Sequence, residues 1–271
     1  MPAVPATPRH CARSRGGAFN CDIGGGFSPV PVDCRDCPLR RRKAFQPFTD
    51  AELAFMRRFK AGELVVSPRT TILLEGAASP QLFTALAGWG VRYKLLPDGG
   101  RQVINFVMPG DLIGLQAGLL GEMQHGVDAV TDMTLCVFAR ADLWSLFRDM
   151  PSRAYDLTWL AAREEHFLGD MLATIGRRSG LERVAWGLVT LYRRAEAREL
   201  VKGGRMPMPF RQQDLADAFG LSLVHTNKTL RTLRARGLIR LSDGTLHIPD
   251  LARLEACSNM EVTPEPPRPL I

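Results

Sequence analysis

"RQQDLADAFGLSLVHTNKTLRTLRARGLI" spans residues 211–239 and contains two amphipathic runs separated by a glycine. The first run places Leu215 and Phe219 on one face at helical spacing and stops at Gly220, the residue type that most often follows a helix end. The second run follows at once, and Ser222 is its candidate N-cap. Two helices joined by so short a turn must cross steeply, so this stretch predicts a helix-turn-helix.

The second run also separates apolar from basic side chains. The inner stripe comprises Thr226, Leu230 and Leu233, and the outer positions are Lys228, Arg231 and Arg234. Downstream, "GLIRLSDGTLHIPDL" predicts a strand, an Asp243-Gly244 turn and a second strand. Helix-turn-helix plus hairpin is a winged module. The alternative is a helical hairpin that only packs within the protein.

The region before the winged module changes character twice. Between residues 62 and 140, short β-prone runs alternate with Gly, Pro and Asp turns, which predicts an antiparallel sandwich or barrel. Residues 151–178 then follow a helical pattern for about seven turns. Ser179 and Glu182 form a capping box that starts a fresh helix, so a domain boundary is expected near Ser179. The fold class is therefore α+β.

The long helix carries two apolar stripes, and one can pack on the chain's own β unit while the other meets a partner. We assign the first stripe to dimerisation; it consists of Leu157, Leu160, Glu164, Phe167 and Met171. The second, flanking stripe consists of Leu168, Leu172 and Ile175. The alternative is a core helix that lies wholly within one subunit.

Composition sets limits on the class of protein. The 271 residues carry 35 Lys and Arg against 28 Asp and Glu, a net charge of +7 that suits a polyanionic partner. The most apolar region, residues 103–120, is interrupted by Pro109, Gly110 and Asp111, so no transmembrane span is expected. The first residues have no apolar core of a secretory signal. We expect a cytoplasmic protein that does not associate with membranes.

The order of these parts resembles the CRP/FNR family of bacterial transcription regulators, over roughly residues 34–255. Two motifs carry the resemblance: "PGDLIGL" at 109–115 and "QQDLADAFGLSLVHTNKTLRTLRARGLI" at 212–239. The resemblance implies a cyclic-nucleotide-binding-like β-roll (a double-stranded β-helix or jelly roll), a long dimerisation helix and a C-terminal winged helix-turn-helix. It also implies a homodimer on two-fold symmetric double-stranded DNA and RNA polymerase as a partner.

This organisation predicts five segments. They are a flexible Cys/Arg-rich segment at 1–46, a β-roll sensor domain at 47–141, a dimerisation helix at 142–178, a winged helix-turn-helix DNA-binding domain at 179–258 and a disordered tail at 259–271.

The recognition helix predicts how DNA is read. Family members commonly use a Glu and an Arg four residues apart, whereas Val224 and Lys228 stand at these positions. Val224 can touch thymine methyl groups, Asn227 can pair with adenine, and Lys228 can donate to guanine. The expected DNA contacts are Arg211, Gln212, Gln213, Ser222, Leu223, Val224, His225, Asn227, Lys228, Arg231 and Arg234. For His225, a hydrogen bond to DNA is favoured over zinc ligation or base catalysis.

The resemblance also limits the ligand. Family members that bind cyclic AMP hold it with a Glu, an Arg and a Ser, and the matching positions here are Leu115, His125 and Gly126. Without the bidentate cation and the ribose acceptor, we expect no cyclic AMP binding.

Cysteine spacing leaves the redox chemistry open. Cys34 and Cys37 resemble the N-terminal region of the oxygen-sensing FNR branch, and Cys136 falls where that branch has a distant cluster ligand. "RRRK" stands where the branch's third N-terminal cysteine would lie, and a [4Fe-4S] cluster needs four ligands. Cys11 or Cys21 could supply the fourth. We expect plain thiols and no cofactor, with an iron-sulfur cluster or zinc as the alternatives.

Two other functions compete with DNA-binding regulation. An enzyme is disfavoured because the five histidines are scattered and no HExxH, GxSxG or P-loop spacing occurs. The second is a redox- or ligand-sensing module whose winged domain docks a protein partner instead of DNA.

Overall fold

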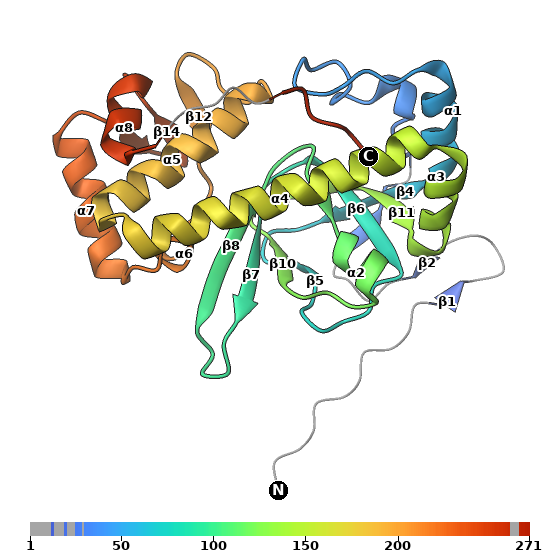
Figure 1. Cartoon of the computed structure of the whole chain (residues 1–271), viewed down its shortest axis with the longest axis horizontal. Helices are drawn as coiled ribbons and strands as arrows, with labels where there is room; N and C mark the ends of the chain where they lie inside the picture. The colour runs from blue at the N-terminus through green and yellow to red at the C-terminus, as the bar shows by residue number, and fades with distance from the viewer. Residues whose placement is uncertain (1–11, 14–18, 21–24, 29, 261–265) are drawn as a thin grey trace, which may run out of the picture.

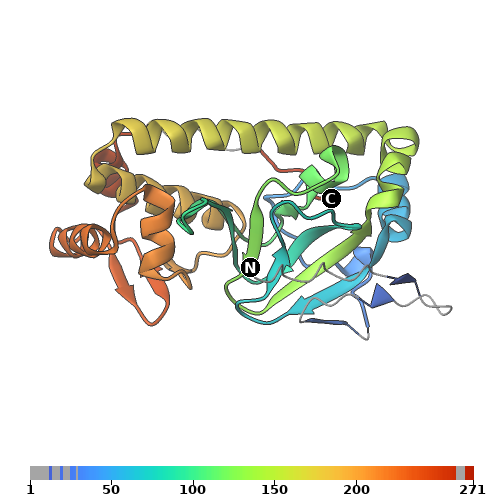
Figure 2. The same ribbon diagram turned by 90° about the horizontal axis from the view of Figure 1, so that it is seen from below.

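The computed structural model describes residues 12–13, 19–20, 25–28, 30–260 and 266–271. A β-roll and a winged helix-turn-helix lie side by side, and one long helix, α4, runs along both (Figure 1). Figure 2 shows α4 as a nearly straight rod above the two lobes. No helix in these described ranges is long and apolar enough to span a lipid bilayer.

The β-roll is built from two antiparallel sheets, which confirms the predicted sandwich. One sheet has the order β5-β10-β7-β8 and the other β3-β4-β11-β6-β9. The bounds of the first sheet are β5 Thr71–Leu73, β10 Gly126–Ala129, β7 Gly90–Leu95 and β8 Arg101–Val107. Those of the second are β3 Gly25–Phe27, β4 Lys60–Val66, β11 Met133–Ala139, β6 Gln81–Ala87 and β9 Leu112–Ile113. A separate two-stranded pair is β1 Ala12–Arg13 with β2 Phe19–Asn20.

A glycine allows the tight corner between β6 and β7. Gly88 has φ +88°, and a Cβ atom there would lie 2.2 Å from the Asp132 carbonyl oxygen. Only a residue without a side chain therefore fits where the chain passes from one sheet to the other.

Short helices flank the roll. The first, α1 (Asp50–Phe59), begins at Thr49, which forms a capping box with Glu52. The others are η1 Cys34–Asp36, α2 Leu115–Leu120, η2 Arg140–Asp142 and α3 Leu143–Asp149. Phe55, Phe59 and Phe138 stack in series and join α1 to β11.

The long helix α4 spans Pro151–Arg177, and α5 spans Gly180–Ala197. Ser179 and Glu182 form the predicted capping box that separates the two. Arg178, the last residue before that cap, leaves the helical conformation, so the break falls where the sequence predicts it.

The helix-turn-helix prediction is confirmed. Helix α6 (Gln212–Phe219) ends at Gly220, which adopts the left-handed conformation with φ +62°, and Ser222 caps α7 (Leu223–Ala235). The wing is a three-stranded sheet of β12 Arg205–Pro207, β14 Thr245–His247 and β13 Arg240–Ser242. Asp243 and Gly244 both have positive φ in the predicted hairpin turn. Helix α8 (Leu251–Ser258) closes the domain against α5.

The segment predicted to be flexible, residues 1–46, is packed in part. β3 pairs with β4, Leu39 is completely buried, and Phe45 lies in the same apolar cluster as α1. The prediction is wrong for these residues because the Pro, Gly and Arg content of the segment hides two apolar anchors, Leu39 and Phe45. The remainder lies partly outside the described residues.

The tail predicted to be disordered, residues 259–271, is also packed where it is described. Leu270 and Ile271 are buried among residues of α1 and β6, and Arg268 pairs with the backbone beside Phe45. The proline-rich composition of this tail is typical of disorder. It does not show that the two terminal aliphatic residues pack against distant parts of the chain, so the prediction of disorder is wrong for them.

Candidate DNA-binding site

The recognition helix α7 presents a basic, partly apolar surface. Its inner residues Thr226, Leu230 and Leu233 are buried, as predicted. Val224 is 79 % exposed, and Lys228 is exposed one turn further along the helix. An exposed apolar residue beside a cation on the first turns of a recognition helix suits contact with base edges in a major groove.

The arginines expected to meet phosphates are exposed. Arg231 and Arg234 follow Lys228 along α7, while Arg211 stands at the entry to α6. Gln212 is exposed beside Arg211, and Leu223 is 41 % exposed at the start of α7. These cations surround the exposed face of α7 at Val224 and Lys228, and none of them forms a salt bridge with another described residue.

Three predicted contacts have local roles. The Ser222 hydroxyl accepts a hydrogen bond from the His225 amide at 3.2 Å and so caps α7. Gln213 donates to Asp217 at 2.5 Å. The ring of His225 packs at Gly180, where a Cβ atom would lie 2.7 Å from Nε2. Ser222, Gln213 and His225 are nevertheless exposed, so each retains a face toward solvent.

Asn227 differs from its prediction. It is half-buried, and its side-chain oxygen is covered with no hydrogen-bond partner among the described residues. It therefore does not share the fully exposed face of Val224 and Lys228. The helical period predicts its direction only to within about one residue, and the covering by neighbours comes from tertiary packing.

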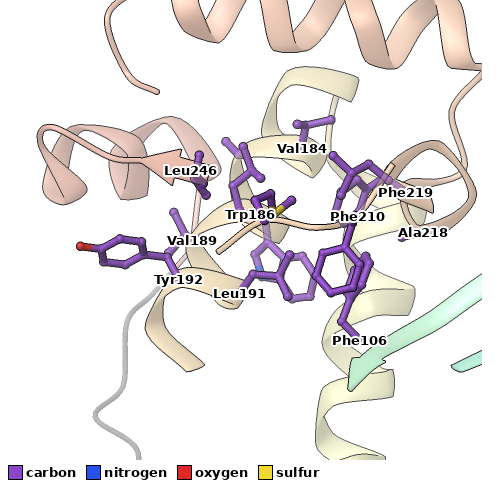
Figure 3. Close-up of a cluster of buried hydrophobic side chains, with 14 of the residues drawn as sticks. Phe106, Val184, Trp186, Val189, Leu191, Tyr192, Phe210, Ala218, Phe219 and Leu246 are labelled. Atoms are coloured by element: carbon purple, nitrogen blue, oxygen red, sulfur yellow. The ribbon is translucent and has the colours of Figure 1, made fainter. Parts of the chain in front are cut away.

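The DNA-binding domain is anchored on the β-roll of its own chain. Phe106 of β8 lies 4.4 Å, centroid to centroid, from Phe210 before α6, within the apolar cluster shown in Figure 3. Arg101 of β8 forms ion pairs with Asp214 at 2.5 Å and with Asp217 at 2.7 Å. Both carboxylates belong to α6. Apolar and ionic contacts together fix the helix-turn-helix on the sheet while its recognition face stays open.

The stripe assigned to dimerisation faces inward, which corrects the prediction. Leu157 is only 2 % exposed, and Leu160 and Met171 are also buried within the chain. Glu164 pairs with Arg92 of β7 at 3.2 Å. Phe167 stacks on Trp186 of α5. Periodicity identifies an apolar stripe but does not tell which core it faces.

The flanking stripe is the one left open. Leu172 is 74 % exposed and Leu168 is 40 % exposed, whereas Ile175 is partly buried. The same exposed face of α4 carries the charged residue Glu165 and a run of small residues: Thr158, Ala161, Ala162, Gly169, Ala173 and Gly176. We call this surface the outer stripe; the sequence signal that could have found it was the run of small residues, which permits close helix approach.

Comparisons with known proteins agree with this architecture. Residues 57–150 match the cyclic nucleotide-binding domain family, and residues 182–257 match the Crp-like helix-turn-helix domain family. The nitrogen fixation regulation protein FixK of Bradyrhizobium diazoefficiens is 33 % identical over 227 residues, covering 82 % of this chain and 92 % of that protein. The chain belongs to the CRP/FNR family of transcription regulators.

Two further relatives place it within that family. The transcriptional activator protein FnrL of Cereibacter sphaeroides is 25 % identical, covering 82 % of this chain and 90 % of that protein. The solved structure of FixK2 from Bradyrhizobium japonicum superposes with a TM-score of 0.67 at 25 % identity, covering 74 % of this chain and 98 % of that one. This CRP/FNR protein is thus a transcription regulator with a helix-turn-helix DNA-binding domain.

The three positions expected to match the cyclic-AMP-binding residues of the family are buried or half-buried in this CRP/FNR chain. Leu115 begins α2, and His125 is buried. Gly126 lies against the Tyr93 ring, where a Cβ atom would come within 2.5 Å. Burial first, and then the charge of Arg92, lowers the pKa of His125 to about 4, so the imidazole is neutral near pH 7 and cannot replace a phosphate-binding arginine.

The structure brings the predicted cysteines together around one cation. Cys34, Cys37 and Cys136 lie near one another, and Lys60 lies close to Cys34 and Cys136. Burial raises the pKa of the Cys136 thiol to about 12 and also raises the pKa of Cys34.

This thiol group does not fit the implied iron-sulfur cluster within the described residues. A cluster needs four thiolates, and burial disfavours the thiolate form here. Cys11 and Cys21 lie outside the described residues, and Cys257 packs in the DNA-binding domain. No group of three or more potential ligands among the described residues has metal-binding geometry.

Proposed function

We propose that the protein is a homodimer that binds a two-fold symmetric DNA operator in a sequence-specific manner, with the β-roll controlling its activity. The observation that carries the proposal is the exposed face of α7 at Val224 and Lys228, framed by cations and open to solvent. Such a surface reads base edges while surrounding arginines hold the phosphates.

The outer stripe supports the dimer. Its exposed leucines and small residues extend along a 27-residue helix that both lobes contact from the other side. A second copy of α4 would cover them around a two-fold axis, with small residues allowing close approach. Two recognition helices would then reach successive major grooves.

The remaining parts of the proposal follow from the family and from the β-roll. RNA polymerase is the further partner, and the cytoplasm is the place of action. The regulator acts by binding and has no enzymatic activity of its own. Neutral, buried His125 supports a β-roll that does not bind cyclic AMP, and the buried thiols support cysteines without a cofactor.

The experiment is selection from a random DNA pool with the full-length protein, followed by affinity measurement on the selected site. Lys228→Ala should weaken specific binding by about 1 to 3 kcal/mol, because a base contact is lost. Arg58→Ala, an exposed arginine on α1 in the β-roll, is the matched control and should leave affinity unchanged.

Two results would contradict the proposal. One is a pool without a consensus, and the other is a Lys228→Ala protein that binds the selected site as well as the wild type. The second result would favour a winged domain that docks a protein partner.

A further inference from the structure

The C-terminal residues pack against the β-roll and the segment before α1. The Arg268 amide donates to the Ala44 carbonyl at 2.7 Å, and the Gln46 amide donates to the Arg268 carbonyl at 2.9 Å. The Thr84 hydroxyl of β6 donates to the backbone oxygen of Ile271 at 2.5 Å. Backbone pairing with buried aliphatic side chains is how an extended peptide is held against a sheet.

The Arg268 side chain reaches a buried ion cluster between the two lobes. Its guanidinium lies 3.1 Å from the Asp111 carboxylate of the β-roll. Arg194 and Arg198 of α5 pair with the same carboxylate at 3.0 Å and 2.8 Å. One carboxylate thus joins the β-roll, the first helix of the DNA-binding domain and the tail.

The other end of the tail is tied to the hinge between α4 and α5. Arg178 donates to the Ser258 carbonyl at 3.1 Å and to the Asn259 carbonyl at 2.9 Å. The chain therefore leaves the DNA-binding domain at the hinge and is held again on the β-roll at residues 266–271. The described ends of the tail thus contact both lobes, which α4 also joins (Figure 1).

We propose that residues 266–271 are an intramolecular latch, and that the backbone of residues 44–46 with the apolar surface beside it is a peptide site whose occupant is this tail. The docked latch holds the DNA-binding domain on the β-roll. Because Val224 and Lys228 remain exposed in this arrangement, the latch does not cover the recognition helix. It positions the domain for binding by removing its freedom to reorient.

The charges show why the latch can open. Four guanidinium groups, those of Arg92, Arg194, Arg198 and Arg268, gather around the carboxylates of Asp111 and Glu164. Loss of Arg268 would leave Asp111 paired with two arginines, Arg194 and Arg198. Repulsion among the arginines opposes the attraction to Asp111 and so weakens the hold of this cluster on Arg268.

Hydrogen exchange at two backbone amides can measure, in the absence of DNA, whether the tail is docked and whether the DNA-binding domain is docked. The Gln46 amide bonds to the tail, whereas the Lys43 amide donates to the Glu199 carboxylate just after α5 at 3.1 Å. Hydrogen exchange at Gln46 therefore measures docking of the tail, and exchange at Lys43 measures docking of the DNA-binding domain.

The test compares full-length wild type with Arg268→Ala and, separately, Leu270→Ser. Exchange should rise about tenfold or more at both amides in both variants, since a charged hydrogen bond or a buried side chain is lost. The matched control is Arg41→Ala, which alters an exposed arginine near Lys43 and Gln46. It should change the exchange of neither amide. Protected amides in β11 verify that each variant is folded.

Affinity for selected DNA provides a second readout, which rests on the proposed function. Both latch variants should bind about fivefold more weakly, a typical coupling between distant sites. Fast exchange at Gln46 in the wild type, or a rise at Gln46 without one at Lys43, would overturn the latch. Equal or tighter DNA binding by the variants would overturn its positioning role. Absence of any selected consensus would instead contradict the proposed function, and the exchange data would still decide the latch.

Discussion

Gly187 on α5 lies directly against the ring of Phe219 at the end of α6, so that a Cβ atom at Gly187 would come within 1.9 Å of the ring atom Cζ. Phe219 is completely buried, which leaves its ring no space into which to move. This contact sets how closely the first helix of the helix-turn-helix approaches the helix that supports it.

Gly187→Ala should therefore destabilise the DNA-binding domain. Within a helix, alanine is normally favoured over glycine by about 1 kcal/mol. Overpacking against an immobile ring costs about 1 to 3 kcal/mol and outweighs that gain. Urea unfolding followed by circular dichroism measures the difference.

A double-mutant cycle provides the control for this contact. Phe219→Leu removes the ring atoms that clash, so the double variant should be less destabilised than the sum of the two single variants. Strict additivity would show that the contact does not limit the packing of α5 on α6.

The outer stripe of α4 leads to a prediction about assembly. Leu172→Asp places a charge on a side chain that is 74 % exposed in one chain but buried in the proposed dimer. Sedimentation should show monomers for this variant and dimers for the wild type. The control is Asp170→Ala, on the polar side of the same helix, which should remain a dimer.

Leu157→Ala separates the outer stripe from the inward-facing one. Because Leu157 is buried within the chain, its truncation should lower the free energy of unfolding by about 2 to 5 kcal/mol and leave the association of folded chains intact. A folded but monomeric Leu157→Ala variant would instead indicate that the dimer forms through the inward-facing stripe.

His125 predicts a pH dependence of stability. Its pKa is about 4 in the folded protein and 6.5 in the unfolded chain, so the unfolded state binds more protons between these values. Stability should therefore fall as the pH is lowered from about 6.5 toward 4, by at most about 1.4 kcal/mol per pH unit for this one proton. Denaturant unfolding at pH 7, 6 and 5 measures the slope.

The charged neighbours of His125 determine the pH range in which its titration can be measured. They are Arg92, Glu164, Lys94 and Glu75. The pKa values of Glu164 and of Glu75 are lowered in the folded protein, so both carboxylates stay ionised across the measured range from pH 7 to 5. His125→Gln should reduce the slope above pH 5, whereas His166→Gln, which alters an exposed histidine, should not. Equal slopes in both variants would show that His125 is not the buried group that titrates.

Local signals in the sequence predicted the local structure. The Ser222 cap, the left-handed Gly220 and the Ser179 to Glu182 capping box each depend on residues within a few positions of one another, and all three form as expected. The exposed face of α7 at Val224 and Lys228 likewise follows from helical periodicity.

Those local signals do not predict which residues pair between distant parts of the chain. The Leu157 side of α4, and not the Leu172 side, meets the β-roll, where Glu164 pairs with Arg92 of β7. This ion pair links a helix to a strand that is distant in the sequence. The pairing of Asp111 with Arg268 joins residues in different halves of the chain. Helical periodicity and helix caps do not predict such a contact. The sequence therefore predicts disorder for a tail that is packed.

The base-reading face provides the most specific prediction. Val224 and Lys228 lie one turn apart on the open side of α7, in the positions where family members commonly carry Glu and Arg. In the double variant Val224→Glu with Lys228→Arg, the carboxylate would accept from cytosine N4 and the guanidinium would donate twice to guanine, each contact discriminating by about 1 to 3 kcal/mol. Selection from a random DNA pool should return a half-site different from that of the wild type.

Arg231→Ala serves as the matched control, because an exposed arginine further along α7 is placed to meet phosphate and not a base edge. Its loss should weaken binding to all sequences alike and flatten the salt dependence by about one unit, while the selected half-site stays that of the wild type. If the double variant also keeps the wild-type half-site, then this face does not read bases. In that case the recognition helix would have to enter the groove on another side, where Asn227 is half-buried and Leu223 and His225 are the other exposed residues of the first turn.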